Sequence, residues 1–160
     1  MAKFSNTAIA LAISAAAYSQ QYNSIHLNNN YMFTIDQIKA VHSKVKSGAD
    51  FPQYVQDIKA LGVVSYNQYV ADGRTVYNGQ DHIAEAPAKY QPFTIASTGN
   101  KERLAHHLKI HQAGETDYLT FCRHAAEDGV EKWTVDTEKM TCTYYDLAGN
   151  VLIEEVIPTV

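Results

Sequence analysis

The chain has 160 residues, of which 46% are hydrophobic and 19% are charged, and its formal net charge is −4. This length and composition fit one globular domain with a proper core and exclude a disordered chain. The acidic balance and the lack of a Lys/Arg cluster argue against nucleic acid as the main partner.

The segment 1–31 has no folded periodicity. Lys3, the apolar residues 8–14 and the small residues 15–17 resemble the zones of a secretory signal. The apolar run is shorter than the roughly 20 residues that span a bilayer. Two interpretations remain: a signal peptide, which would place the protein in the periplasm or outside the cell, or an N-terminal extension of a cytoplasmic protein. We favour the extension, with the domain occupying residues 32–160.

A pair of helices is predicted between Thr34 and Gly62. Thr34 and Gln37 have capping-box spacing, and the apolar residues that follow recur at helical intervals up to Gly48. A second helix is predicted to start at Asp50 and to end at Gly62, with its apolar side chains on one face.

A β-meander is predicted after the helices. Residues 63–70 (VVSYNQYV) and 74–79 (RTVYNG) are rich in β-branched and aromatic residues, and Asp72-Gly73 between them is a hairpin signal. Residues 80–91 are interpreted as a loop with some extended structure, and residues 92–97 (PFTIAS) as a further strand.

The same predicted order of elements, two helices followed by strands, begins again at Asn100. One helix is predicted between Asn100 and Gly114, and another between Thr116 or Asp117 and Gly129. Strands are predicted at 130–137, 139–146 and 150–158, with a turn at 148–150.

Two stretches of the chain match each other. DFPQYVQDIKALGV (50–63) and DYLTFCRHAAEDGV (117–130) align when Asp50 is placed on Asp117. The matched residues have matched roles, so we predict two copies of a helix–helix–meander unit, about 33–97 and 98–158. The fold class is then α+β: one compact domain, with helices packed on an antiparallel sheet. Tyr66 and Trp133 should face the helices, and four glycines should end helices with positive φ: Gly48, Gly62, Gly114 and Gly129.

These stretches also resemble a known family. The run from IKAVHSKVKSGADFPQYVQDIKALGV to GQDH, and IHQAGETDYLTFCRHAAEDGVEKWTVD in the second half, are similar to YdfO-like and YbcV-like bacterial proteins. That domain of unknown function is often met in prophages and is labelled "phage envelope protein". The resemblance covers about residues 33–158, implies an α+β fold and transfers no catalytic residue. The second half departs from the first by having LAGNV where the first has GQDH.

A cluster of histidines raises a metal hypothesis. His107 and His111 are four residues apart on a predicted helix, and His124 or Cys122 on the next helix would complete a zinc site. The helix lacks the adjacent glutamate of a metalloprotease, so structural or surface histidines are favoured. A Cys122 nucleophile would need a histidine partner, and His111 is better placed than His124. Because Cys122 aligns with Val55, a core role is favoured.

The two cysteines and the tyrosines complete the candidate residues. Cys122 and Cys142 lack a CxxC or zinc-type spacing and are expected to be reduced thiols in the core. The chain has 11 tyrosines, and a tyrosine-rich sheet face could dock a partner, although tyrosine is also an ordinary strand residue. The interface candidates are Tyr66, Tyr69, Tyr77, Tyr144 and Tyr145.

Two functions follow. The first is a non-catalytic binding or regulatory module of prophage-associated type, whose partner is a protein or a small ligand. The alternative is a metal-dependent or cysteine-based enzyme that uses His107, His111, Cys122 and His124. The lack of a complete catalytic signature favours the first, with no cofactor; zinc belongs to the alternative. No transmembrane segment is predicted, and a homo-oligomer is left open.

Overall fold

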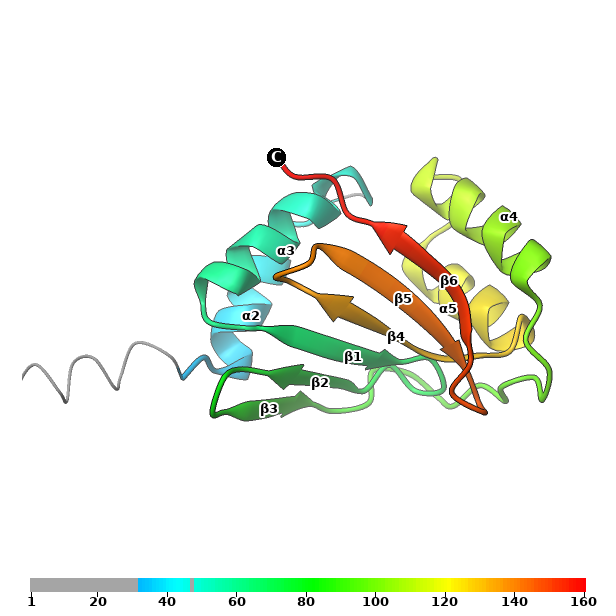
Figure 1. The fold of residues 1–160 in the computed structure, drawn as a ribbon, viewed down its shortest axis with the longest axis horizontal. Helices are drawn as coiled ribbons and strands as arrows, with labels where there is room; N and C mark the ends of the chain where they lie inside the picture. The colour runs from blue at the N-terminus through cyan, green and yellow to red at the C-terminus, as the bar shows by residue number, and fades with distance from the viewer. Residues whose placement is uncertain (1–31, 47) are drawn as a thin grey trace, which may run out of the picture. The chain divides into compact units, whose positions relative to one another are not determined.

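Six antiparallel strands form one sheet in the order β3-β2-β1-β4-β5-β6 (Figure 1). The structure is a computed structural model that describes residues 32–46 and 48–160. The strands are β1 Ser65–Tyr69, β2 Thr75–Asn78, β3 Ile83–Ala86, β4 Val130–Asp136, β5 Thr141–Asp146 and β6 Val151–Val156. The helices are α2 Ile35–His42, the short 3-10 helix η1 Gly48–Asp50, α3 Phe51–Ala60, α4 Lys101–Gln112 and α5 Tyr118–Glu127. The predicted α+β class is confirmed.

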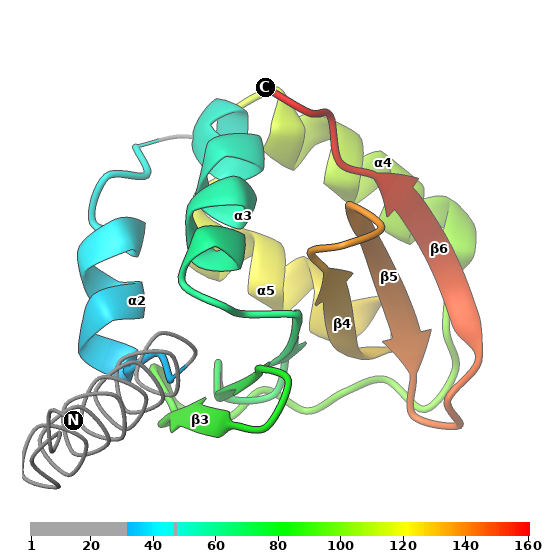
Figure 2. The ribbon, with the colours of Figure 1, turned by 60° about the vertical axis from the view of Figure 1, so that its left-hand side comes forward.

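Helices α2, α3, α4 and α5 lie on one side of the sheet (Figures 1 and 2). Tyr66 of β1 and Val135 of β4 are buried and belong to the core that the helices cover. Their neighbours Asn67 and Thr134 point to the opposite face, where the Thr134 hydroxyl donates to Asn67 Oδ1 at 2.7 Å. One face of the sheet is therefore apolar and the other polar, as expected when helices cover a single face.

The element order repeats, and the sheet order reflects the repeat. Each half contributes two helices and then three strands, and the two halves meet where β1 pairs with β4. In that pairing Asn67 lies opposite Thr134, and the two residues are 67 positions apart. The same offset places Asp50 on Asp117 in the aligned stretches. Adding the offset to Asn67 therefore gives Thr134, the residue that lies opposite it in the sheet. A local two-fold axis between the halves would produce this relation.

The flanking pairs obey the same rule. Tyr66 lies opposite Val135, and Gln68 lies opposite Trp133. Adding the repeat offset to Tyr66 gives Trp133, and adding it to Gln68 gives Val135. Each residue of one pair thus has its sequence counterpart in the other pair. Tyr66 and Trp133 consequently lie on the same sheet face, toward the helices, which confirms that prediction.

A stack of three aromatic rings anchors each half. The first-half stack is Tyr54, Tyr66 and Tyr77, with ring centroids 6.4 and 5.3 Å apart. The second-half stack is Phe121, Trp133 and Tyr144, with centroids 5.8 and 5.9 Å apart. Each member of the second stack follows its counterpart in the first by the repeat offset. Each stack ties a helix to two strands, within the distances at which aromatic rings attract one another.

The first helix is shorter than predicted. The Thr34–Gln37 capping box is present, with Gln37 N donating to Thr34 Oγ1 at 3.2 Å. The helix ends at His42, however, and Gly48 starts the 3-10 helix instead of ending an α-helix. Asp50 does not cap α3 with its side chain; it accepts from Lys46 N at 2.9 Å. The carboxylate thus fastens the connecting loop, and Gly48 is not among the glycines with positive φ.

The predicted strand at 92–97 is wrong. This segment crosses the end of the sheet, where Phe93 N donates to Ala71 O at 2.7 Å and Ala96 N donates to Ala126 O at 2.9 Å. Its backbone therefore bonds to a turn and to a helix end, and its apolar side chains pack against the core. The third strand of the first half lies earlier, in the stretch interpreted as a loop.

Gly62, Gly114 and Gly129 have φ values of +99°, +78° and +81°, which confirms those predictions. Gly114 and Gly129 differ in their surroundings: a Cβ on Gly114 would meet nothing within 4 Å, whereas one on Gly129 would lie 2.5 Å from Thr98 O. We predict that Gly114→Ala costs about 1 kcal/mol of unfolding free energy, through φ alone. Gly129→Ala should cost roughly 3 kcal/mol, because backbone must also move. Urea unfolding measures both, and equal losses would contradict this interpretation.

Candidate functional site

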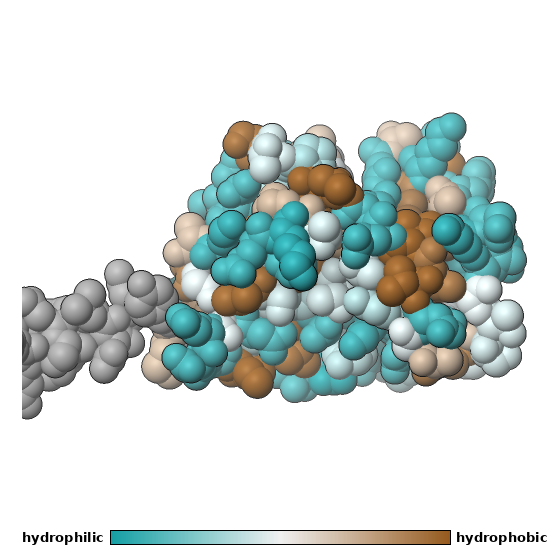
Figure 3. Space-filling view, viewed as in Figure 1, coloured by the Kyte–Doolittle hydropathy of each residue, from teal (hydrophilic) through white to brown (hydrophobic). Residues whose placement is uncertain are grey.

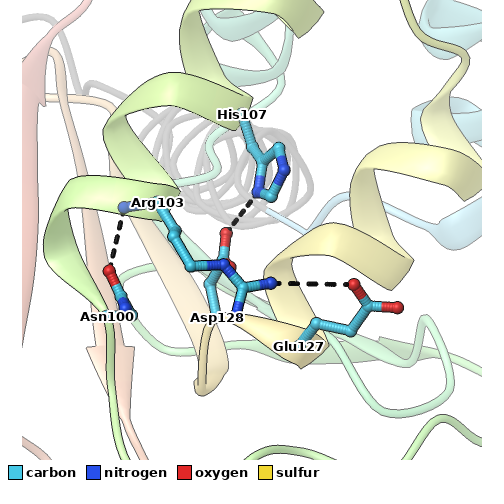
Figure 4. A network of polar contacts seen from close by, with 5 residues as sticks. All are labelled: Asn100, Arg103, His107, Glu127 and Asp128. Carbon is cyan, nitrogen blue, oxygen red and sulfur yellow. Dashed lines mark hydrogen bonds and ion pairs between the residues drawn. The ribbon is translucent and has the colours of Figure 1, made fainter.

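A buried carboxylate organises the contact between α4 and the end of α5 (Figure 4). Asp128, the residue that caps α5, is fully buried. Its Oδ2 lies 2.6 Å from His107 Nδ1, and its Oδ1 lies 3.1 Å from Arg103 Nε. Arg103 is half exposed and also lies 3.8 Å from Glu127. The buried charge is therefore compensated by a hydrogen bond with His107 and by an ion pair with Arg103, both from α4, while Oδ1 itself accepts no hydrogen bond among the described residues.

The same contact stacks two imidazoles. The His107 and His124 ring centroids lie 4.0 Å apart, with 17° between the ring planes. Since a carboxylate only accepts, His107 donates to Asp128 through Nδ1. His124 Nδ1 is buried and has no hydrogen-bond partner among the described residues. We call His107, His124, Asp128 and Arg103 the imidazole cluster.

The imidazole cluster has no counterpart in the first half. Leu61 corresponds to Asp128 at the offset that relates the second helices. Val41 corresponds to His107 at the offset that relates the helix caps Thr34 and Asn100. Both counterparts in the first half are aliphatic. The second half carries a polar network that the fold itself does not demand.

The four residues of the metal hypothesis do not converge. His111 stacks on Phe121 at 4.5 Å and bonds Thr116, whereas His107 stacks on His124. Cys122 is fully buried. Within 32–46 and 48–160, no group of three or more His, Cys, Asp or Glu is arranged to hold a metal ion. The zinc hypothesis stays a prediction that this geometry does not support.

The cysteines lie where a core role requires. Cys122 and Cys142 are both buried free thiols. Burial raises the pKa of Cys122, and it raises the pKa of Cys142 to about 12. Both thiols are therefore protonated at neutral pH, which argues against nucleophilic use of Cys122 as it stands.

The predicted tyrosine interface divides between the two sheet faces. Tyr66, Tyr77 and Tyr144 are only 5–6% exposed and pack under the helices, so the prediction of a docking surface is wrong for them. The sheet register places them on the apolar face. Tyr69 and Tyr145 are half-buried on the polar face, with Arg74 over the Tyr69 ring at 4.0 Å. On the side of the molecule shown in Figure 3, hydrophilic side chains are widespread and apolar ones form separate patches.

A second polar group lies between the halves, on the helix side of the sheet. Its hydroxyls belong to Tyr54, Tyr66, Tyr77, Tyr90 and Tyr118, which we call the tyrosine cluster. The Tyr54 and Tyr77 hydroxyls are 3.3 Å apart, and Tyr90 donates to Val70 O at 2.8 Å. Burial raises the pKa of every one of these hydroxyls. They therefore remain neutral hydrogen-bonding groups at neutral pH.

Tyr118 connects the tyrosine cluster to the surface. Tyr118 is 42% exposed, and burial of its hydroxyl raises the pKa of that group. Tyr118 belongs to the second half of the chain, whereas Tyr90 belongs to the first.

Lys89 brings a positive charge to this group. Its Nζ lies 3.5 Å from the hydroxyl of Thr75, which is fully buried. Desolvation lowers the pKa of Lys89, although the residue as a whole is exposed.

Sequence reasoning missed most of these residues. Lys89 and Tyr90 lie in the stretch interpreted as a loop, where no periodicity marks a site. Asp128 stands where the repeat has Leu61, and that departure from the repeat was a usable signal. Tyr54 and Tyr118 were interpreted only as helix-face aromatic residues.

The comparisons identify the family but no activity. The family described as "Protein of unknown function (DUF1398)" matches residues 39–156, and the chain belongs to it. Uncharacterised proteins of Mycobacterium bovis and of two Mycobacterium tuberculosis strains are each 25% identical over 116 residues. The match covers 65% of this chain and 65% of each relative. None of the helices in the part of the chain that the structure describes has the length and apolarity to cross a membrane.

The imidazole cluster predicts unequal effects at two neighbouring acids. Asp128→Asn keeps the shape but removes the buried charge that compensates Arg103 and His107, so it should cost about 2 kcal/mol of unfolding free energy. Glu127→Gln neutralises a half-exposed partner of the same arginine and should cost less than about 0.5 kcal/mol. Denaturant titrations of the two variants measure both losses of unfolding free energy. Similar losses for the two variants would show that Asp128 is not specially important.

Stability should fall as the solution becomes mildly acidic. Burial lowers the pKa of His42 and of His111 from the ordinary value of 6.5. The unfolded chain then binds protons that the folded chain does not, so stability is lost as the pH falls below 6.5. A His42→Gln/His111→Gln variant should lose less between about pH 7 and pH 5. Thermal melts at both pH values test this, and an unchanged pH dependence would contradict it.

Proposed function

We propose that the domain is a non-catalytic binding module that takes up a small ligand at the tyrosine cluster, between its two halves. The first-half stack carries three hydroxyls, whereas the second-half stack carries one, on Tyr144. Phe121 and Trp133 fill the equivalent positions of Tyr54 and Tyr66 without a hydroxyl. Because the second half forms the same ring contacts with a single hydroxyl, ring packing alone does not account for the extra hydroxyls of the first half. This difference is the observation that carries the proposal.

The position of the tyrosine cluster also supports the binding of a small ligand. Helix backbones pack most closely within each pair, α2 with α3 and α4 with α5. The tyrosine cluster takes Tyr54 from α3 of the first half and Tyr118 from α5 of the second. Ligand sites typically combine aromatic walls with a few convergent polar groups. The tyrosine cluster supplies both, and the ring of Tyr118 gives it an edge toward solvent.

A fragment screen by NMR tests the proposal. Small aromatic fragments should perturb the amide signals of residues 118–122 and 89–90 in the isotope-labelled full chain. Tyr118→Ala should weaken that binding by about tenfold, which corresponds to roughly 1.4 kcal/mol. Tyr69→Ala, on the polar sheet face, is the matched control and should leave it unchanged. If fragments perturb only residues elsewhere, or if Tyr118→Ala has no effect, the site is wrong.

The imidazole cluster favours a second candidate, a hydrolase that uses His107 as a general base. The 2.6 Å contact from Asp128 to His107 Nδ1 is the arrangement that orients a histidine for proton transfer at Nε2. Hydrolysis of p-nitrophenyl acetate by the wild type and by His107→Gln separates the two candidates. Equal rates support the binding module, and a loss of about tenfold or more in the variant supports the hydrolase.

The prophage-associated setting rests on the resemblance to YdfO-like and YbcV-like proteins alone. It adds no residue to the site. Protein docking at Tyr69 and Tyr145 on the polar face also stays a prediction, and a small ligand is preferred because the cluster of desolvated hydroxyls lies on the other side of the sheet.

A further inference from the structure

The two edges of the sheet differ, although they occupy equivalent places in the two halves. β3 forms one edge and β6 forms the other. Val76 pairs with Glu85 of β3, and Thr143 pairs with Glu154 of β6. Because Val76 and Thr143 are separated by the repeat offset, Glu85 and Glu154 are counterparts on the two edges. The edges can therefore be compared residue by residue.

The β3 edge is protected against the addition of a further strand. Arg74 Nη1 lies 3.5 Å from Glu85 Oε1, so the carboxylate on this edge has a cation beside it. Pro87 directly follows the strand and has no N–H to offer to a neighbour. Proline and charged side chains are common means by which proteins protect sheet edges.

The β6 edge lacks both the arginine and the proline. At the repeat offset Arg74 corresponds to Thr141, and Thr141 pairs with Val156. Continuing the register of β2 and β3 by one pair places Pro87 opposite Arg74. Val156 therefore stands in the sheet where the first half has Pro87.

The carboxylates of β6 have neutral partners. Glu154 accepts from the Thr143 hydroxyl at 2.9 Å, and Glu155 accepts from the Gln112 side-chain amide at 3.0 Å. Neither glutamate takes part in an ion pair in the described part of the chain. The edge thus carries two negative charges without a cation of its own.

The backbone of β6 presents hydrogen-bonding groups on its free side. Ile157 N donates to Met140 O at 2.8 Å, and hydrogen-bonded pairs alternate along an antiparallel ladder. The backbone of Glu155 is therefore directed toward β5, and the backbones of Glu154 and Val156 are directed away from it. Among the described residues, no hydrogen bond from outside the sheet reaches those two backbones.

Exposed apolar side chains border the same edge. Val151 and Val156 stand at the two ends of β6 and are 57% and 80% exposed. Figure 3 shows an apolar patch in the region of β6. An added strand would cover these valines with its own apolar residues, because side chains on adjacent strands pack in pairs.

We propose that β6 is a docking strand for an extended segment of a partner protein, which carries lysine or arginine and adds antiparallel to the free edge. The inference goes beyond the proposed function, because no residue of β6 belongs to the tyrosine cluster. The backbones of Glu154 and Val156 pair with the added strand, which is the usual source of affinity in such complexes.

Charge selects the occupant of the edge. Lysine or arginine side chains opposite Glu154 and Glu155 supply the cations that the edge lacks, and opposite charges on paired strands attract. A second copy of β6 would instead bring two more glutamates to the same place, and like charges on adjacent strands are destabilising. A basic segment of another protein therefore fits the edge better than this chain itself does.

Titration of the isotope-labelled full chain with two blocked hexapeptides tests the inference. The lysine peptide, Val-Lys-Lys-Ile-Thr-Val, places its lysines opposite Glu155 and Glu154 when it runs antiparallel to β6. It should shift the amide signals of residues 152–156 saturably at millimolar concentration. The glutamate peptide, Val-Glu-Glu-Ile-Thr-Val, should bind at least about tenfold more weakly, because its charges repel those of the edge.

Variants of the chain separate the backbone from the charge. Val156→Pro removes an N–H on the free side, as Pro87 does on the other edge, and should weaken the lysine peptide by about tenfold. Glu154→Gln should weaken it by about threefold. Glu85→Gln, the counterpart on the β3 edge, is the matched control and should bind the peptide as the wild type does. Thermal melts of all variants should confirm folding.

Several results would overturn the docking strand. Equal binding of the two peptides would remove the role of charge, and normal binding by Val156→Pro would remove the role of the edge backbone. Shifts confined to β3, or no shift of β6 signals at all, would show that the edge is wrong. Self-association of the full chain that Val156→Pro abolishes would make a second copy the occupant.

Discussion

The antiparallel pairing of β1 with β4 is the contact on which the arrangement of the domain depends. It joins the two halves at the centre of the sheet, and its register equals the offset of the repeat, with Asn67 opposite Thr134. Because side chains alternate across a strand, a slip of one residue would turn Tyr66 and Trp133 to the polar face and remove both aromatic stacks from the core. The pairing therefore fixes the fold and the place where the helix pairs meet.

The two halves have the same element order, so residues that differ between them at matched positions are informative. Where the halves pack in the same way, such a difference is not dictated by packing alone. Tyr54 differs from Phe121 by a hydroxyl, and Leu61 differs from Asp128 by a buried charge. Each difference costs desolvation that the other copy avoids. The tyrosine cluster and the imidazole cluster are both defined by such differences.

Much of the fold could be predicted from the sequence. Helical spacing and glycine stops indicated α3, α4 and α5, since local propensity and tertiary packing agree there. The end of α2 could not be predicted, because the loop that follows is fastened by the Asp50 side chain. The prediction of a strand at 92–97 was wrong because this segment crosses the end of the sheet with its apolar side chains against the core. Such a segment has the same local composition as a strand.

The site was harder to predict than the fold. The sequence pointed to Cys122, His107 and His124, but their neighbours come from distant parts of the chain. Lys89 meets Thr75 only after the sheet has formed. The tyrosines of the strands were recognised as unusual, whereas the face to which each points depends on register. Patterns in a single sequence predict local secondary structure. They do not predict which residues from distant parts of the chain meet in a site, because that depends on the tertiary fold.

The hydroxyls of Tyr54 and Tyr77 give the most direct test that this junction serves binding and not folding. Unfolding free energy and the affinity for the small aromatic fragments can be measured together in a Tyr54→Phe/Tyr77→Phe variant. Removing both partners of one hydrogen bond should change stability by less than about 1 kcal/mol while weakening the binding of the fragments. A loss of roughly 3 kcal/mol or more, with the fragments bound normally by the folded protein, would show that the hydroxyls hold the structure together and would contradict the account.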